Sequence, residues 1–287
     1  MVPTAKTFKF TKAELTAQKV LDACGLDDPT ELPISEIILG RRAFYEEKPL
    51  SGKEGEIITV KGKSIITINS QIEYESKKRF AAAHELGHFE MHKDLYPIIS
   101  DTDQDLLSWF QGGPHEVEAN EFASEFLMPS TVFYKECERK VFGPDLIDHL
   151  AKRFQVSKTA AILKFVKAGN HPICIVFCKG NKMKWFKPSH DFRYFLEFQR
   201  DFPPPTGSVA YELYTTKKVY TGNESKQDIW KSDWLRMNDD EPDSRFFEYC
   251  LFAKSYDYTI SVIWEKYEIV TTIEFFHSIL WFNNTLH

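Results

Sequence analysis

The segment His84-Glu85-Leu86-Gly87-His88 holds the residues best suited to chemistry in this sequence. Two histidines four positions apart lie on one face of an α-helix, at the spacing that lets two imidazoles bind one Zn²⁺ ion. Glu85 lies beside that face, where its carboxylate can reach a water molecule without binding the metal. The pattern therefore predicts a zinc site with an adjacent general base.

A catalytic zinc site needs a third protein ligand and an open coordination position. Glu116 and Asn120 lie one turn apart in a second predicted helix, over residues 116–128. Glu116 can supply a carboxylate, and Asn120 an amide oxygen that accepts the free N–H of a ligating histidine and fixes its tautomer. Helical rotation favours Glu116. Other residues stay open as the third ligand: Glu118, Glu121, Glu125, Asp94, Asp101, Asp103, Asp105 and His115.

The elements that must position these residues are also predicted by the sequence. Thr11 and Glu14 have the spacing of a capping box, so we expect a helix from there toward Gly25. Further helices are expected at 35–39, 75–92, 116–128, 130–140, 145–154 and 158–168, with Ser130 and Ser157 as caps. Strands are expected near 44–45 and at 56–60, 64–69, 173–178, 184–186, 246–253 and 258–264, whereas 93–114 is expected to be a loop.

Composition limits the class of protein. The 287 residues are 43% hydrophobic and carry a net charge of −6, which is typical of a globular protein of one large or two modest domains. Any contact with nucleic acid must therefore come from a local basic patch. The five cysteines are scattered, and no stretch approaches the roughly 18 apolar residues of a membrane helix. We therefore expect no disulfide framework, no membrane and a cytoplasmic location.

Two strings resemble the ImmA/IrrE metallopeptidases. The first is RFAAAHELGH, which follows a predicted strand ending at Ile68-Asn69, and the second is EVEANEFASEFLMPS. The matching positions of the second string are Glu116, Ala119, Asn120, Phe122, Ala123, Leu127, Met128 and Pro129. The resemblance covers residues 10–168, including the helical pair around Phe154 to Ser157.

This resemblance implies that His84, His88 and Glu116 bind Zn²⁺ and that Glu85 is the general base. It also implies an endopeptidase that cleaves a helix-turn-helix transcriptional repressor and so activates stress or phage-response genes. The expected fold is α+β: a zincin-like metallopeptidase core with a small antiparallel sheet, then a helical pair, then an α+β sensor-like domain. We place these parts at residues 1–129, 130–170 and 171–287.

Several features of the expected site stay open. An oxyanion donor besides zinc is not readable, and His92, Tyr96, His115 and Tyr134 are nearby candidates. Residues 65–69 either form an edge strand that pairs with an extended substrate or lie inside the sheet. A thiolate of Cys137 is a candidate for blocking the zinc, whereas Cys174 and Cys178, on one face of a strand, are expected to be buried.

An alternative function is a DNA-binding or scaffolding regulator with a structural or vestigial zinc site. The pair of helices at 145–168 has helix-turn-helix proportions, and Lys158, Lys164 and Lys167 are expected to project from its second helix.

Residues 171–200 suggest a regulatory contact. Six basic and two acidic residues are interleaved with aromatic rings there, as in proteins that bind single-stranded DNA without sequence preference. We expect single-stranded DNA as the first candidate activator and a small aromatic-pocket ligand as the second. The alternative is that the rings form the core of the domain and the lysines a solvated hairpin. The candidate binding residues are Lys182, Lys184, Trp185, Lys187 and Arg193.

Overall fold

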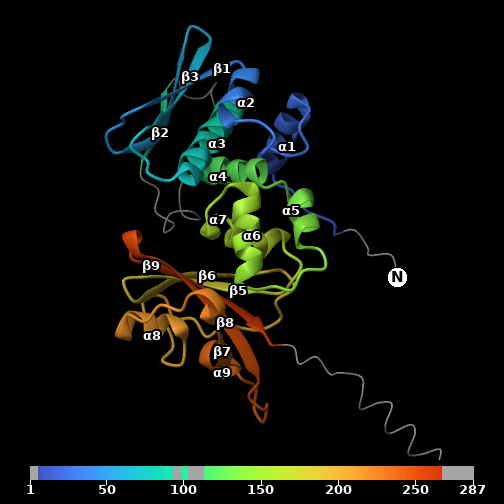
Figure 1. The fold of residues 1–287 in the computed structure, drawn as a ribbon, viewed down its shortest axis with the longest axis vertical. Coiled ribbons are helices and arrows are strands. Elements are labelled where there is room, and N and C mark those ends of the chain that lie inside the picture. Colours follow the sequence, from blue (N-terminus) through green and yellow to red (C-terminus); the bar gives the residue numbers. More distant parts are fainter. Residues whose placement is uncertain (1–5, 93–97, 103–112, 267–287) are drawn as a thin grey trace, which may run out of the picture.

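Two β-sheets with helices between them form the molecule (Figure 1). The computed structural model describes residues 6–92, 98–102 and 113–266. Within these residues, the first sheet has the strand order β1-β3-β2-β4 and the second β6-β5-β9-β8-β7. The predicted helical pair, α6 and α7, lies between the two sheets (Figure 1).

The first half contains nearly all of its predicted elements. Thr11 accepts from Glu14 N–H while the Glu14 carboxylate accepts from Thr11 N–H, so the capping box is confirmed. The bounds are α1 Lys12–Cys24, α2 Ile34–Gly40, β1 Ala43–Lys48, β2 Lys53–Val60, β3 Lys63–Asn69, α3 Glu75–His92, β4 Ile98–Thr102 and α4 Pro114–Leu127.

Two predictions about the first sheet are wrong. The sheet is mixed rather than antiparallel, because β3 pairs in parallel with β1 on one side and antiparallel with β2 on the other. The same pairing places residues 65–69 inside the sheet, which is the second of the two alternatives left open by the sequence. Residues 98–102 are not loop, because β4 pairs antiparallel with β2. Both errors concern pairing between segments far apart in the sequence, which local periodicity does not report.

The helices that follow are α5 Ser130–Cys137, α6 Pro144–Phe154 and α7 Lys158–Ala168. Ser157 caps α7 by accepting from Ala160 N–H, as predicted. Ser130 is not a cap: it is buried, and its hydroxyl donates to Glu125 at 2.6 Å. Because α5 ends at Cys137, it is shorter than predicted.

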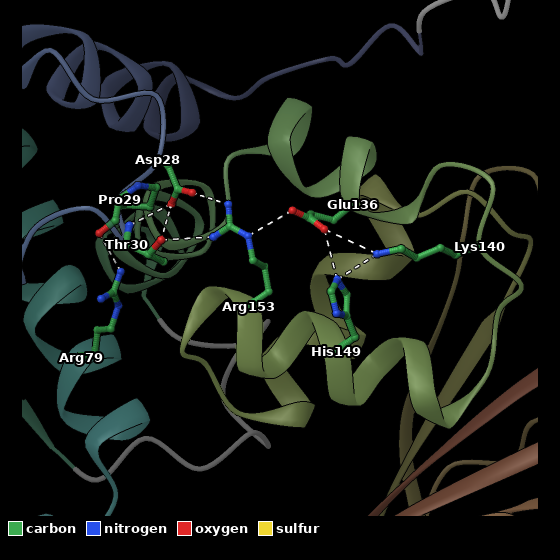
Figure 2. Close-up of polar contacts among 8 residues, drawn as sticks. All are labelled: Asp28, Pro29, Thr30, Arg79, Glu136, Lys140, His149 and Arg153. Atoms are coloured by element: carbon green, nitrogen blue, oxygen red, sulfur yellow. Dashed lines mark hydrogen bonds and ion pairs between the residues drawn. The ribbon is translucent and has the colours of Figure 1, made fainter.

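Arg153 of α6 joins three segments of the chain (Figure 2). Its guanidinium donates to Asp28, in the loop after α1, and to Glu136 of α5 at 3.1 Å. From the other side, Arg79 of α3 donates to the carbonyl of Pro29 at 2.9 Å. The loop after α1 therefore links the HExxH helix to α5 and α6.

The second half is built on the five-stranded sheet. Its elements are β5 Cys174–Lys179, β6 Lys182–Pro188, α8 Val209–Thr216, η1 Gly222–Glu224, β7 Lys226–Trp230, α9 Lys231–Trp234, β8 Arg245–Ala253, η2 Lys254–Tyr256 and β9 Tyr258–Glu265. The two predicted strand pairs are confirmed as β5–β6 and β8–β9, whereas β7, α8 and α9 were not predicted. The tail after Lys266 lies outside the described residues.

Successive side chains of β5 point to opposite faces of the sheet and belong to two different hydrophobic clusters. Ile175 and Phe177 join a hydrophobic cluster that extends through α7 to α1, whereas Cys174, Val176 and Cys178 join a second cluster beneath α8 and α9. The C-terminal sheet therefore packs one face against the helices of the first half. The predicted domain boundaries at 129 and 170 stay predictions.

Candidate metal centre

The candidate centre forms where α3 and α4 pack closely together. Gly87, within the HExxH motif, allows this approach: a Cβ built there would lie 3.0 Å from Cδ1 of Phe122 on α4. A side chain at position 87 would therefore crowd Phe122 at the contact between the two helices.

The structure brings the three predicted ligands together. The ligand atoms of His84, His88 and Glu116 all lie within 4.8 Å of one another. The two Nε2 atoms are 3.0 Å apart, and they lie 3.2 and 3.4 Å from the two Glu116 carboxylate oxygens. Two imidazoles and a carboxylate are the donor set of a catalytic zinc site, so these residues fit the ion.

Both histidines have a hydrogen-bond partner behind them. Nδ1 of His84 lies 2.9 Å from Oδ1 of Asn120, as the spacing of Glu116 and Asn120 predicts. Nδ1 of His88 lies 2.9 Å from Nδ1 of His92, and Nε2 of His92 lies 2.8 Å from Glu118. When Nε2 of a histidine binds a metal, Nδ1 carries the proton, so these partners can hold the two rings in the ligating tautomer.

Electrostatics favours the ligating forms of His88 and Glu116. Burial lowers the pKa of His88 and thereby keeps its imidazole neutral. Burial opposes the ionisation of Glu116, but hydrogen bonds from His84 and His88 outweigh it and lower the pKa of that carboxyl. A neutral imidazole and an ionised carboxylate are the forms that bind Zn²⁺.

Glu85 lies on α3 between the two histidines and is buried against β2. A Cβ built at Gly55 of β2 would come within 2.8 Å of Cγ of Glu85 and 2.6 Å of its Oε1. A glycine at this strand position therefore leaves the room that the predicted general base occupies.

A second group of potential ligands lies on the same two helices and was not predicted. The ligand atoms of His92, His115 and Glu118 also lie within 4.8 Å of one another. The signal was present in the sequence, because His84, His88 and His92 continue one stripe at intervals of four residues. Glu118 was weighed as a third ligand of the first group, but its carboxylate lies against His92 instead.

The remaining alternatives for the third ligand lie elsewhere. Glu125 is buried and bonds to Lys164 at 2.6 Å and to Gln18 at 2.9 Å. Glu121 belongs to neither group of potential ligands. The side chains of Asp94, Asp101, Asp103, Asp105 and the oxyanion candidate Tyr96 lie outside the described residues.

The lysines of the predicted DNA-reading helix are not a free basic face. Lys164 does not project from α7 into solvent: it is buried and paired with Glu125 of α4. Lys167 bonds to Glu14, and Lys158 lies 2.7 Å from Asp148.

Four of the predicted binding residues of the C-terminal half lie on β6, and Arg193 lies in the segment that follows it. Trp185 stacks on Phe177 of the core, at 4.9 Å between ring centroids, whereas Lys184 lies 2.6 Å from Asp201. Lys182, Lys187 and Arg193 are exposed. Desolvation nevertheless lowers the pKa of Lys187.

Four of the five cysteines, Cys137, Cys174, Cys178 and Cys250, are buried free thiols. Cys174 and Cys178 are buried as predicted, and burial raises the pKa of each to about 12. Burial also raises the pKa of Cys137 to about 12, which disfavours the thiolate that a zinc-blocking role requires. The oxyanion candidate Tyr134 packs its ring against Phe8 and Lys6.

The fold and the His-His-Glu group define a candidate metallopeptidase, and comparison with known proteins agrees. Residues 39–165 match the family model described as the IrrE N-terminal-like domain, a peptidase domain. This region of the chain therefore belongs to the ImmA/IrrE family.

A solved structure described as a Mycobacterium tuberculosis transcriptional regulator has a similar fold. Its TM-score is 0.58 at 12% identity, over 96% of this chain and 81% of that one. The similarity therefore includes the C-terminal half. No curated protein matches the sequence. Among the described residues, no helix is long and apolar enough to cross a membrane.

Proposed function

We propose that this protein is a zinc endopeptidase that cleaves a helix-turn-helix transcriptional repressor. The main support for this proposal is that the ligand atoms of His84, His88 and Glu116 lie within 4.8 Å of one another inside an IrrE-like peptidase domain. A bound metal ion would polarise the scissile carbonyl and acidify water. Glu85 would accept a proton from the attacking water and deliver it to the leaving amine.

The chain's own residues supply the rest of the chemistry. Asn120 and His92 hold the imidazole rings, and β2 confines the carboxylate of Glu85 at Gly55. A general base fixed in this way needs little reorganisation as the proton moves, which favours hydrolysis.

The test compares Glu85→Gln with Glu73→Gln, a change of an exposed carboxylate just before α3. Elemental analysis should find one zinc per chain in both variants. Cleavage of a co-encoded repressor should fall about 10²- to 10⁴-fold in Glu85→Gln and stay unchanged in Glu73→Gln. Cleavage that continues undiminished in metal-free protein would exclude the proposal.

The alternative, a DNA-binding or scaffolding regulator, makes the opposite prediction. Reversing the charge of Lys158 and Lys167 would then abolish function, whereas Glu85→Gln would not. The ion pairs of both lysines and the burial of Lys164 favour the peptidase instead.

We also propose that residues 171–287 receive the activating signal, with single-stranded DNA as the first candidate. Exposed Lys182 and Arg193 lie in the same segment as the exposed rings of Phe186 and Phe195. A labelled oligonucleotide should bind the full chain at low salt, and each lost phosphate contact should lower the salt slope by about 0.7. Lys182→Glu combined with Phe186→Ala, both at exposed positions of β6, should abolish stimulation by DNA while zinc content stays constant. An absence of binding at low salt would leave the small-ligand signal.

A further inference from the structure

A cleft of about 790 Å³ lies beside the candidate metal centre. His84 and Asn120 line it, together with Phe80 and Ala81 from the preceding turn of α3. Another lining residue, Glu54, precedes Gly55, the position at which β2 lies against Glu85. A molecule in this cleft would therefore lie against the candidate ligand His84, beside the strand segment that packs on Glu85.

The C-terminal half of the chain forms the opposite wall of this cleft. Leu251 to Tyr256 and Tyr258, from the end of β8 to the start of β9, line it together with the first turn of α7. Two contacts join this C-terminal segment to the helices that line the cleft. The hydroxyls of Tyr258 and Thr159 are 3.2 Å apart, and Lys77 of α3 lies 5.4 Å from the ring centroid of Tyr256.

Most of the surface that lines the cleft is apolar. Phe80 and Leu163 contribute to it from the peptidase side, and Leu251 and Tyr256 from the C-terminal side. Charged groups are fewer and partly compensated: Lys77 lies 2.7 Å from Glu54, and Lys158 lies 2.7 Å from Asp148. Such a lining recognises aliphatic and aromatic groups through burial rather than through charge.

We propose that this cleft binds the substrate segment next to the scissile bond and selects bulky apolar residues there. The inference rests on the proposed peptidase function. A peptide with its scissile carbonyl at the metal must place its neighbouring residues beside His84, and the cleft adjoins the metal centre at that point. The C-terminal half is then part of the substrate site, in addition to any role in receiving a signal.

The experiment uses full-length, zinc-loaded Glu85→Gln protein, so that binding is measured without cleavage. A peptide library is selected on this protein, and the affinities of the selected peptides are measured again after Tyr256→Ala. Tyr256 is 45% exposed and lies on the C-terminal wall, and Phe202→Ala is the matched control because Phe202 is 59% exposed and does not line the cleft. Tyr256→Phe retains the ring, and thermal unfolding checks that each variant folds.

Selected peptides should be rich in bulky apolar residues, and Tyr256→Ala should weaken their binding about tenfold. Phe202→Ala and Tyr256→Phe should change affinity little. The inference fails if the selected peptides are polar, if Tyr256→Ala binds them as tightly as its parent, or if no peptide binds. If the peptides bind as expected but protein with Glu85 restored does not cleave them, the peptidase function fails and the cleft assignment stands.

Discussion

Helices α3 and α4 carry two groups of two histidines and a glutamate, and the groups differ in how they are held. In the first group, His84 and His88 are 2% and 1% exposed, and Asn120 and His92 lie behind their rings. In the second group, the side chains of His115 and Glu118 are 42% and 40% exposed. Residue types alone therefore do not distinguish a candidate catalytic centre from its neighbour.

His92 belongs to the second group but also serves the first. If His88 binds metal through Nε2, its Nδ1–H donates to Nδ1 of His92, which must then carry its own proton on Nε2. That proton faces Glu118. Nε2 of His92 is therefore protonated and cannot bind a metal ion in the second group. We infer that a filled first group disfavours metal in the second, and that His92 and Glu118 act as a support for His88.

The largest expected effect is the difference in zinc affinity between Glu116→Ala and Glu118→Ala. Glu116→Ala removes a ligand, so zinc affinity should fall by more than the roughly 10- to 100-fold that loss of an outer partner costs. Glu118→Ala removes a carboxylate that contacts His92 rather than a ligand or a partner of a ligand, so zinc affinity should fall less than about tenfold. Competition with a chelator measures both values. Equal losses in the two variants would mean that the groups have been assigned wrongly.

Gly55→Ala tests whether Glu85, which lies beside the first group, is the general base. The added Cβ would lie 2.8 Å from Cγ of Glu85, so the carboxylate must move. A displacement of about 1 Å at a reacting group costs on the order of 100-fold in kcat. Zinc content should stay at one per chain, and Gly52→Ser, at a glycine of positive φ with open space around it, controls for a general disturbance of this region. Unchanged kcat in Gly55→Ala would argue against Glu85 as the base.

His92→Ala tests the shared histidine. Loss of the ring removes the acceptor for Nδ1–H of His88, so zinc affinity should fall about 10- to 100-fold, as expected for an outer partner. His115→Ala, in the second group alone, should leave affinity unchanged. In NMR spectra of the zinc-loaded protein, the Nδ1 proton of His88 should be protected from exchange and should lose that protection in His92→Ala. A larger effect from His115→Ala would indicate that the second group binds metal itself.

The sequence predicts the first group well because its geometry is local. The spacing of His84 and His88 fixes their common face within one helix, and the same argument places Glu116 and Asn120 one turn apart. The two pairs come together because α3 and α4 approach closely at Gly87. The spacing of residues within one helix does not predict this contact between helices.

The points that the sequence left open or predicted wrongly concern partners far away in the sequence. The interior position of β3 depends on pairing with β1, about 20 residues upstream. Lys164 is charged and was expected in solvent, but it faces Glu125, 39 positions before it in the chain. The inward stacking of Trp185 likewise depends on the packing of the C-terminal sheet against the helices.

The smallest effect is expected for Arg153→Met, which serves as a control. This substitution lowers the stability of the fold but lies outside both histidine-glutamate groups. Arg153→Met removes the cation that links Asp28 and Glu136 (Figure 2). Desolvation raises the pKa of Asp28, but the hydrogen bonds from Arg153 and Thr30, together with the charge of Arg153, outweigh it. Hydrogen bonds from His149 and Arg153 lower the pKa of Glu136. The free energy of unfolding at pH 7 should fall by about 1 kcal/mol, the scale of a partly exposed ion pair.

The pH dependence of that difference follows from the direction of the two shifts. A carboxyl whose pKa is lower in the folded state stabilises the fold above its unfolded pKa, near 4, and loses this contribution as pH falls through the folded value. The gap between wild type and Arg153→Met should therefore be full at pH 7 and shrink below about pH 4. Urea unfolding of metal-free protein at both pH values measures it. Zinc affinity at pH 7 should be unchanged in the variant, because a modest loss of stability leaves the ligands of α3 and α4 in place. A parallel loss of affinity would mean that the two groups differ through general stability rather than through what lies behind their histidines.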